Sequence, residues 1–270
     1  MLIIISPAKT MNFKDHSKKG KEEKEIIPSI GKDKKIQTIF DNKTSKIINS
    51  LKKLSIHELE NKMKISNNIA KNLYELIKNY HQLESKQSLF AYSGDVYKNI
   101  YPQDFTKEDL KFASSHLRII SGLYGILSPI ENIVAYRLEM KISLEISEDQ
   151  GKIKNIKLSK FWHEEITSYI NNELSLHKNK ILINLASDEY SEAINSNLKY
   201  KKINILFRDK IDNNLKNIAV NSKRARGLIS RFIIKNKIDD PNKIKEFNES
   251  AYIFSKEYSN ENNFYFVRNR

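Results

Sequence analysis

The sequence contains no cysteine, which excludes disulfide bonds and thiolate-based metal or redox chemistry. It also lacks any run of about 18 apolar residues, and its opening apolar run, residues 1–5, is far too short for the core of a signal peptide. No linker is long enough to require two domains, and 270 residues can bury a sizeable core. We therefore expect one domain, residues 1–270, that is cytoplasmic and has no membrane partner.

The charge balance is strongly basic. Lys and Arg number 47 against 33 Asp and Glu, which gives a net charge of +14 and a pI near 9.5. Such a charge favours nucleic acid or another polyanion as a partner. Lysine, asparagine and isoleucine are abundant throughout, as an AT-rich genome would produce, so codon bias accounts for part of the excess lysine. Arginine is scarce, which makes its cluster at Arg224, Arg226 and Arg231 more informative than any run of lysines.

The stretch 222–237 combines an apolar stripe with this cluster of cations. Its apolar residues recur at helical spacing and Ser222 is a suitable N-cap, so the pattern predicts a buried amphipathic helix. Lys223, Arg224 and Arg226 then fall in the first turn, where the helix dipole already presents positive charge and an anion would be favoured. Arg224, Arg231 and Lys235 line one flank of the apolar stripe, and Gly227 beside them leaves the backbone open to close approach. This flank is predicted to bind a phosphate. The alternative is a core helix whose long basic side chains reach out to water.

A second informative stretch covers residues 117–130, where Gly122 and Gly125 interrupt an apolar run. A tight hairpin between two helices is the favoured interpretation, with Ser121, Gly122 and Gly125 at its tip. Such a hairpin can aim backbone N–H groups at a DNA phosphate, as helix-hairpin-helix elements do. The spacing Gly-Leu-Tyr-Gly matches that motif only approximately, and a buried turn that needs small residues is the alternative.

Two apolar runs, residues 1–5 and 180–185, predict strands that are buried on both faces. In α/β folds the chemistry is placed where a strand ends and a helix begins. The polar residues near these ends, together with the carboxylate of a Gly-Asp turn, form our candidate catalytic set: Lys9, Asp95, Ser187, Asp188, Glu189 and Tyr190. Asp188 and Glu189 would act as an acid/base or metal-facing pair. The alternatives are a helix cap and ordinary turn chemistry.

Histidine gives no metal signal in the sequence. The six His residues are scattered without ligand spacing. His163-Glu164 begins like the zinc motif H-E-x-x-H, but residue 167 is threonine. Lys9-Thr10 follows a strand as in a phosphate-binding loop, yet the glycines of that motif are missing. We therefore predict no metal site and no cofactor.

The remaining chain is predicted to alternate helices and strands. Residues 88–97 should form a strand that turns into a short helix, and residues 136–144 a strand that presents Arg137 to a cleft. Other expectations are strands at 203–207, 215–220 and 264–267, capping boxes at Ser55 and Thr106, a helix introduced by Ser159, a mobile surface loop at 15–35 and a polar loop at 145–155.

Six stretches together resemble the YaaA family of bacterial peroxide-stress resistance proteins, and they occur in the same order over nearly the whole chain. They are Met1-Leu-Ile-Ile-Ile-Ser-Pro-Ala-Lys-Thr10, Gly94-Asp-Val-Tyr97, Ser121-Gly-Leu-Tyr-Gly125, Tyr136-Arg-Leu-Glu-Met140, Asn184-Leu-Ala-Ser-Asp-Glu-Tyr190 and Lys223-Arg-Ala-Arg-Gly-Leu-Ile-Ser-Arg-Phe-Ile-Ile234. The loops at 15–35 and 145–155 depart most from the family.

The resemblance implies a single mixed α/β (α+β) domain, with a central mixed sheet flanked by helices and a helix-hairpin-helix-like element beside a basic cleft. It further implies that the protein binds double-stranded DNA, protects it and limits free iron during hydrogen peroxide stress. The cleft cations would be Arg137, Lys223, Arg224, Arg226 and Arg231, and a monomer is expected. An enzyme acting on a nucleobase or nucleotide in the same cleft, with Asp188 and Glu189 as acid and base, is the alternative.

Overall fold

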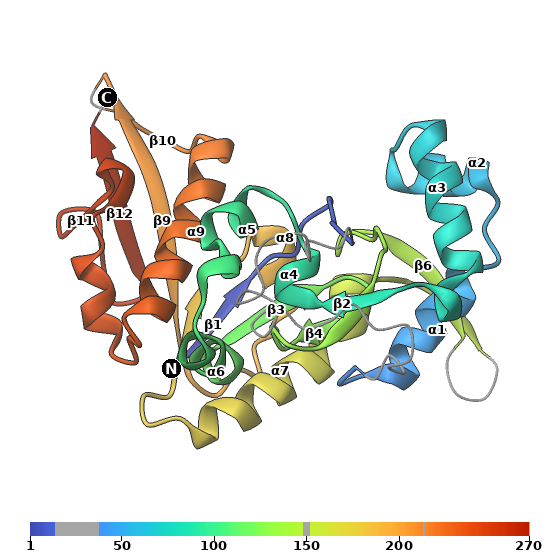
Figure 1. The fold of residues 1–270 in the computed structure, drawn as a ribbon, viewed down its shortest axis with the longest axis horizontal. Helices are drawn as coiled ribbons and strands as arrows, with labels where there is room; N and C mark the ends of the chain where they lie inside the picture. The colour runs from blue at the N-terminus through green and yellow to red at the C-terminus, as the bar shows by residue number, and fades with distance from the viewer. Residues whose placement is uncertain (14–37, 148–151, 213, 270) are drawn as a thin grey trace, which may run out of the picture.

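The computed structural model describes residues 1–13, 38–147, 152–212 and 214–269, so the loop predicted at 15–35 lies outside the described residues (Figure 1). Its α-helices are α1 (Asp41–Leu51), α2 (Ile56–Met63), α3 (Asn67–Lys78), α4 (Ser88–Ala91), α5 (Asp95–Ile100), α6 (Lys107–His116), α7 (Leu158–Leu176), α8 (Asp188–Ser191) and α9 (Ala219–Lys235). Its short 3₁₀ helices are η2 (Tyr80–Gln82), η3 (Pro102–Asp104), η5 (Pro241–Glu246) and η6 (Glu249–Ala251). No helix in these ranges is both long enough and apolar enough to cross a membrane.

The strands are β1 (Leu2–Ile5), β2 (Ser85–Gln87), β3 (Leu117–Ser121), β4 (Gly125–Leu127), β5 (Asn132–Val134), β6 (Ser143–Ser147), β7 (Ile153–Lys157), β8 (Ile181–Asn184), β9 (Lys201–Ile211), β10 (Asn214–Lys216), β11 (Ile253–Ser255) and β12 (Asn263–Asn269). Within the described part of the chain, eight of them form a central sheet in the order β11-β12-β9-β8-β1-β3-β4, with β10 paired to β9. The inner pairs are parallel, while β4, β10 and β11 are antiparallel to their neighbours. The predicted mixed α/β class with a central mixed sheet is confirmed.

Strand β1 lies in the middle of this sheet, as its apolar sequence predicts. Residues 1–5 are all fully buried. The next strand of the sheet along the chain, β3, pairs with one edge of β1, whereas β8 pairs with the other edge and leads on to β9 and β12. The order of strands therefore reverses at β1. In open parallel sheets a crevice forms at such a reversal, beyond the carboxyl ends of the strands, and it is the usual place for a ligand.

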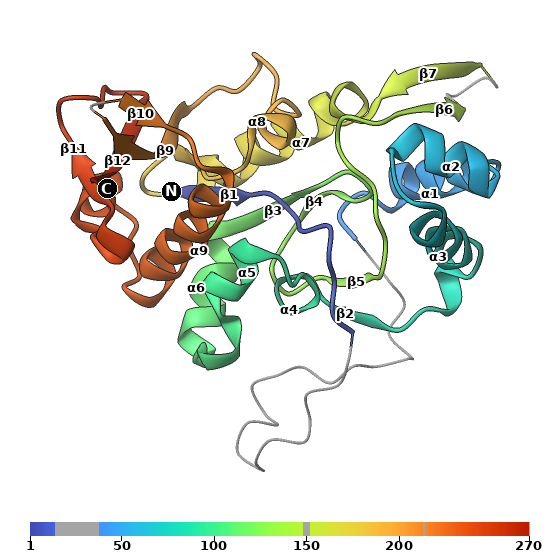
Figure 2. The same cartoon turned by 90° about the horizontal axis from the view of Figure 1, so that it is seen from above.

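Helices cover both faces of the sheet. Figure 2 shows α7 against one face and α5, α6 and α9 against the other. Helices α1, α2 and α3 gather at the end of the molecule opposite α9 (Figure 1). Trp162 of α7 is fully buried, and its Nε1 donates a hydrogen bond of 3.0 Å to the carbonyl oxygen of Gly122. The single tryptophan is thus a core residue, as its helical spacing predicts.

Several predicted strands are confirmed. The runs at 1–5, 180–185 and 264–267 correspond to β1, β8 and β12, and the run at 203–207 lies inside β9. The strand predicted at 215–220 is only partly correct. It ends at Lys216 in β10, because the chain enters α9 at Ala219.

Three other expectations need correction. Residues 88–91 form α4 rather than a strand, although the short helix expected after the Gly-Asp turn is present as α5. Of the strand predicted at 136–144, only the end belongs to β6. The polar segment at 145–155 contributes to an antiparallel pair, β6 with β7, on either side of residues outside the described ranges. Alternation in β6 places Leu144 and Ile146 in the core, which explains why this polar segment pairs.

The predicted helix-hairpin-helix element is wrong. Residues 121–125 form the turn of a β-hairpin, in which Ser121 pairs with Gly125 and Ile120 with Ile126. Gly125 has a φ of +73°, and a Cβ at Gly122 would lie 2.5 Å from the carbonyl oxygen of Leu138. The glycines therefore serve a tight turn and a close packing contact. The N–H groups of residues 123 and 124 donate to Ser121 Oγ inside the core, so they are not directed at an external phosphate.

The helix predicted at 222–237 is confirmed as part of α9, but its start is different. The N-cap is Ile218, and Ser222 lies inside the helix, where its Oγ donates to Asn217 Oδ1 at 2.7 Å. Lys223, Arg224 and Arg226 consequently lie in the second turn, beyond the unpaired N–H groups of the helix start. The prediction that these cations oppose the helix dipole in the first turn is therefore wrong.

Both predicted capping boxes are present, at Ser55 with Glu58 and at Thr106 with Asp109. Asp109 also pairs with Lys235 at 2.9 Å and with Lys237, so it joins the start of α6 to the end of α9. Burial by itself would raise the pKa of Asp109. Hydrogen bonds from Lys235 and Lys237 outweigh this effect, and the pKa falls from 3.8 to about 2. Because the folded pKa lies below the unfolded value, Asp109 contributes stability above pH 4 and loses it as the pH falls towards 2.

We expect Asp109→Asn to lower the free energy of unfolding by about 1–2 kcal/mol at pH 7, because two charge-assisted hydrogen bonds are weakened. The difference from the wild type should shrink between pH 4 and pH 3, where the wild-type carboxylate begins to be protonated in the unfolded chain. Urea unfolding of the wild type and the variant at pH 7 and at pH 3 measures this difference in the free energy of unfolding. Glu246→Gln, at an exposed position, is the matched control. A difference of the same size at pH 7 and pH 3 would contradict the assignment.

Candidate functional site

A cavity of about 330 Å³ opens beyond the carboxyl ends of β1 and β8. We call it the switch-point pocket. It is formed by residues 6–10 after β1, by residues 94–96 at the start of α5, by the segment around α8 and by Lys223 and Arg226 of α9. It lies where the strand order reverses, as expected for a ligand site in an open parallel sheet. Its volume falls in the range of small-ligand pockets.

The two strand ends are bonded to each other at the floor of this pocket. Ser6 Oγ accepts a hydrogen bond of 2.9 Å from the backbone N–H of Ser187 and donates one of 3.3 Å to Ser187 Oγ. Tyr97 of α5 donates its hydroxyl hydrogen to the carbonyl oxygen of Ser6 at 2.9 Å. A Cβ at Gly94 would lie 2.8 Å from the Cβ of Ala8, so the two loops approach closely only because residue 94 is glycine. Three segments that are remote in sequence are thereby held in place.

The pocket collects most of the candidate catalytic residues. Lys9, Asp95, Ser187, Glu189 and Tyr190 all line it. Asp188 is the first residue of α8 and interacts electrostatically with the guanidinium of Arg226. The structure thus brings five of the six candidate residues to one pocket, and Asp188 interacts with a cation that lines it. Ser187 occupies the N-cap position of α8 but its side chain makes no capping hydrogen bond, so capping does not account for it.

Arg226 is the most unusual cation of the pocket. Its Nε is buried and makes no hydrogen bond within the described residues. Burial lowers the pKa of Arg226, Asp188 raises it and Arg208 lowers it. A buried guanidinium with an unsatisfied N–H is costly unless a partner arrives. An anionic ligand in the pocket would supply that partner.

A small side cavity adjoins the pocket, because both are lined by Pro7, Ala8, Lys9 and Tyr190. Its other wall contains Arg137 and Glu139. Glu139 is 3% exposed and pairs with Lys9 at 2.9 Å and with Arg137 at 3.7 Å. Oε2 of Glu139 and Nε of Arg137 are buried and have no hydrogen-bond partner among the described residues. The wall of the side cavity therefore contains one buried acceptor atom and one buried donor atom without a hydrogen-bond partner.

Tyrosine hydroxyl groups connect this wall to the β3–β4 hairpin. Tyr136 bonds to Ser121 at 2.7 Å and to Tyr92 at 2.6 Å. Burial raises the pKa of Tyr136 to about 12, whereas its hydrogen bonds to Ser121 and Tyr92 oppose that rise. Burial also raises the pKa of Tyr190, and Tyr136 and Glu189 add to the effect. These hydroxyls therefore stay protonated at neutral pH and act as hydrogen-bond donors.

The structure does not bring all the predicted DNA-binding residues to the pocket. Arg231 makes a two-armed contact with Asp104, with Nη1 at 2.7 Å and Nη2 at 2.5 Å, so its charge is neutralised within the protein. Arg224 is exposed and does not line the pocket. Ser121, Gly122 and Gly125 are buried in the hairpin turn. Lys223, Arg226 and Arg137 are the predicted cations that line the pocket or its side cavity.

Sequence reasoning missed two site residues, Ser6 and Glu139. Ser6 lies directly after β1, in a loop where the sequence pattern indicates only Lys9 and Thr10. Glu139 lies in an alternating segment that was interpreted as a strand carrying Arg137. An acidic residue between two large apolar residues, Leu138 and Met140, is the sequence signal that could have indicated a buried carboxylate.

A model of the family described as peroxide stress protein YaaA matches residues 1–258 of the chain. The chain belongs to the YaaA family. Relatives named UPF0246 protein include one from Rickettsia felis, 40% identical over 269 residues that cover 99% of this chain and 100% of the relative. Another, from Crocosphaera subtropica, is 38% identical over 269 residues with the same coverage. A third, from Francisella philomiragia, is 38% identical over 274 residues, again covering 99% of this chain and 100% of the relative.

Membership of the YaaA family confirms the resemblance drawn from the six motifs and supports a role in peroxide stress. Each of those motifs contributes to the switch-point pocket, to its side cavity or to the hairpin bonded to it. The YaaA-like motifs, scattered in sequence, thus converge on one region of the fold.

Proposed function

We propose that the protein acts in peroxide stress by binding double-stranded DNA at the mouth of the switch-point pocket, where Lys9, Lys223 and Arg226 receive backbone phosphates. Through this binding it would limit oxidative damage to DNA. Limiting free iron is the second part of the proposed role, and it rests on the family resemblance. The observation that carries the DNA proposal is the buried Nε of the half-buried Arg226, which has no hydrogen-bond partner within the described residues.

The charge of the pocket supports an anionic partner. Lys223 and Arg226, from the second turn of α9, line the pocket together with Lys9 from the loop after β1. Arginine and lysine contact phosphate oxygens without reading sequence, so binding is expected to be independent of base order. The net charge of +14 adds a long-range attraction that guides the protein to a polyanion.

A second candidate function is an enzyme that acts on a nucleobase or nucleotide. It is favoured by the cavity itself, because a smooth duplex does not need a concave site of about 330 Å³. A base extruded from a duplex would enter such a pocket, where Asp188 and Glu189 could act as acid and base. Duplex binding and base chemistry would use the same surface. The enzyme would need either to bind a duplex first or to act on a single-stranded substrate.

We expect duplex DNA binding to weaken steeply with salt, with a slope of about −0.9 in log K against log salt for each phosphate contacted. Lys223→Ala should make that slope shallower by about 0.9, the contribution of one phosphate contact. A fluorescence anisotropy titration at several salt concentrations measures this. Lys78→Ala, on the exposed side of α3 at the opposite end of the molecule, is the matched control (Figure 1). Equal slopes for Lys223→Ala, Lys78→Ala and the wild type would remove Lys223 from the interface.

The enzyme candidate is tested separately with damaged or modified duplexes and with Asp188→Asn. A product formed by the wild type and lost in the variant would assign chemistry to the pocket. If neither the wild type nor Asp188→Asn converts the substrate while both bind the duplex equally well, the pocket binds DNA without chemistry.

A further inference from the structure

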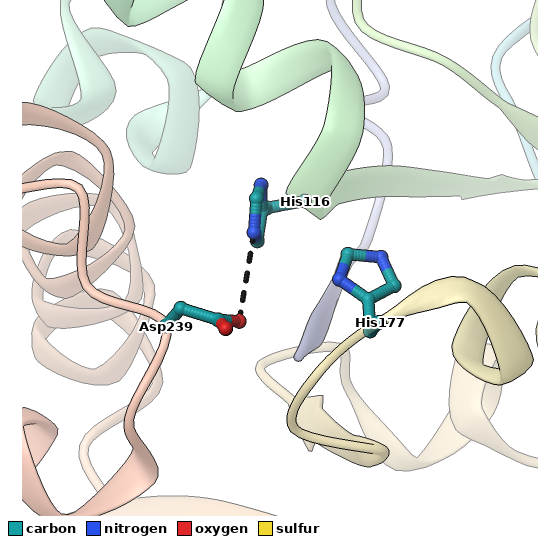
Figure 3. A group of neighbouring side chains, drawn as sticks. All are labelled: His116, His177 and Asp239. Atoms are coloured by element: carbon teal, nitrogen blue, oxygen red, sulfur yellow. Dashed lines mark ion pairs between the residues drawn. The ribbon is translucent and has the colours of Figure 1, made fainter.

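A second group of functional side chains lies at the other end of β1, away from the switch-point pocket. His116 is the last residue of α6, His177 follows α7 and Asp239 lies in the turn after α9. Figure 3 shows the two imidazole rings and the carboxylate facing one central space. One ligand atom from each residue lies within 4.8 Å of the others. The three residues are 61 and 62 positions apart in sequence, so no spacing motif reveals them.

The hydrogen bonds of His116 leave its second nitrogen directed into this space. His116 Nδ1 lies 3.1 Å from the carbonyl oxygen of Phe112, which can only accept, so Nδ1 is assigned the hydrogen. Nε2 then carries a lone pair, and it faces Asp239 Oδ1 at 3.5 Å (Figure 3). The ring of Phe112 stacks on the imidazole with a centroid distance of 3.9 Å and fixes its plane. His116 Nε2 and Asp239 Oδ1 are both electron-rich, so a cation that contacts them is favourable.

Asp239 is held in a matching way. Its Oδ2 accepts a hydrogen bond of 3.2 Å from Asn179, which leaves Oδ1 directed at the histidines. The amino group of Met1 donates to this Oδ1 and approaches His177 Nδ1 at 3.3 Å. A positive group therefore already contacts two of the three acceptors. Such outer hydrogen bonds, from a carbonyl to one imidazole and from an amide to the carboxylate, are typical of metal sites, where they fix the ligands.

The group presents two imidazole nitrogens and one carboxylate oxygen to one space. The guanidinium of Arg118 is bonded to Glu173 and to Tyr169, so its charge is largely compensated. The Met1 amino group contacts Asp239 Oδ1 and His177 Nδ1, and an ion that binds there would take its place.

We propose that His116, His177 and Asp239 bind a divalent first-row transition-metal ion of the zinc class. Two imidazoles and one carboxylate suit such an ion, whereas magnesium and calcium prefer oxygen ligands alone. Metal bonds of about 2.0–2.2 Å would draw the three ligand atoms, which lie within 4.8 Å of one another, closer together. Because the ligands come from three separate elements, the ion would join the ends of α6 and α7 to the segment after α9.

The site is tested with untagged protein that has been freed of metal by a chelator, since a histidine tag would itself bind zinc. Calorimetric titration with Zn²⁺ should give one ion per chain, and Co²⁺ should produce visible absorption bands of a site with nitrogen and oxygen ligands. Zn²⁺ should also raise the Tm, because the ion binds only the folded chain. Absence of Zn²⁺ binding, or equal binding of Mg²⁺, would overturn the proposal.

Variants identify the ligands. His177→Ala and Asp239→Asn should each weaken Zn²⁺ binding by roughly tenfold or more and abolish the rise in Tm. His57→Ala is the matched control, because His57 is exposed on α2 and contacts only Asn61 in the described structure. It should bind Zn²⁺ like the wild type. Circular dichroism of each variant without metal shows that the fold is retained, and His177 is the safer test because Asp239 also forms an ion pair with the Met1 amino group. Wild-type affinity in a folded His177→Ala protein would overturn the assignment.

Discussion

Replacing Gly227 with alanine is expected to destabilise the protein by about 2 kcal/mol or more, although alanine is the better helix former. Gly227 lies in α9 where this helix crosses α5. A Cβ at this position would lie 2.3 Å from the carbonyl oxygen of Val96 and 2.6 Å from the Cβ of Asn99. Neither atom is the far end of a flexible side chain, so the two helices would have to separate.

Two opposing effects decide the sign of this change. Alanine gains about 1 kcal/mol over glycine in a helix interior. Overpacking of a close contact costs typically about 1–3 kcal/mol, and more where backbone must move. The contact at Val96 is with a main-chain oxygen in the middle of the best-packed pair of helices, so the steric cost should exceed the gain in helix propensity.

The same substitution should also disturb the switch-point pocket. Helix α5 carries Asp95 and positions Tyr97, whose hydroxyl bonds to Ser6 at the pocket floor. A shift of α5 would therefore move one wall of the pocket. Urea unfolding measures the loss of stability, and Arg224→Ala is the control, because Arg224 is exposed on the same helix. A Gly227→Ala protein that is as stable as the wild type would show that α5 can move without cost.

Gly227 also illustrates what the sequence could and could not predict. The apolar spacing in 222–237 correctly predicted a buried helix, because periodicity reports which face is covered. The glycine was interpreted as an opening for a phosphate, whereas the structure uses it for helix packing. Glycine in a sequence indicates a close approach but does not say to what. The same ambiguity explains why residues 121–125 were predicted as a hairpin between helices. In the structure they form a hairpin between strands, where the glycines serve the turn and the contact with Leu138.

Strand ends were the better guide to the site. A buried run followed by polar residues predicts chemistry at the carboxyl edge of a sheet, and Lys9, Ser187 and Glu189 lie together there. Which cations join them depends on the rotation of α9 and on the location of Asp104, which binds Arg231. Such side-chain pairings between remote segments leave no periodic signal. The sequence does not predict the group of His116, His177 and Asp239 at the opposite end of β1 for the same reason.

Arg226→Met should have the largest effect on function. If the protein binds DNA as proposed, removal of the guanidinium takes away charge-assisted hydrogen bonds to phosphate, worth about 1.5–3 kcal/mol, which is roughly a tenfold to hundredfold loss of affinity. Arg226→Lys should recover part of this loss, because lysine keeps the charge but not the planar fork. Anisotropy titrations at one fixed salt concentration compare the three proteins, with Arg231→Met as the control for a cation already bonded to Asp104.

The effect of Arg226→Met on stability should have the opposite sign. The buried Nε has no partner in the described structure, and methionine of similar length relieves the cost of holding a charged, unsatisfied group away from water. We therefore expect the Tm to stay the same or rise while affinity falls. Residues that serve folding lose stability when they are replaced, whereas residues kept for a ligand often gain it. A clear fall in Tm for Arg226→Met would instead show that Arg226 stabilises the fold. Its electrostatic interaction with Asp188 would then be its main role.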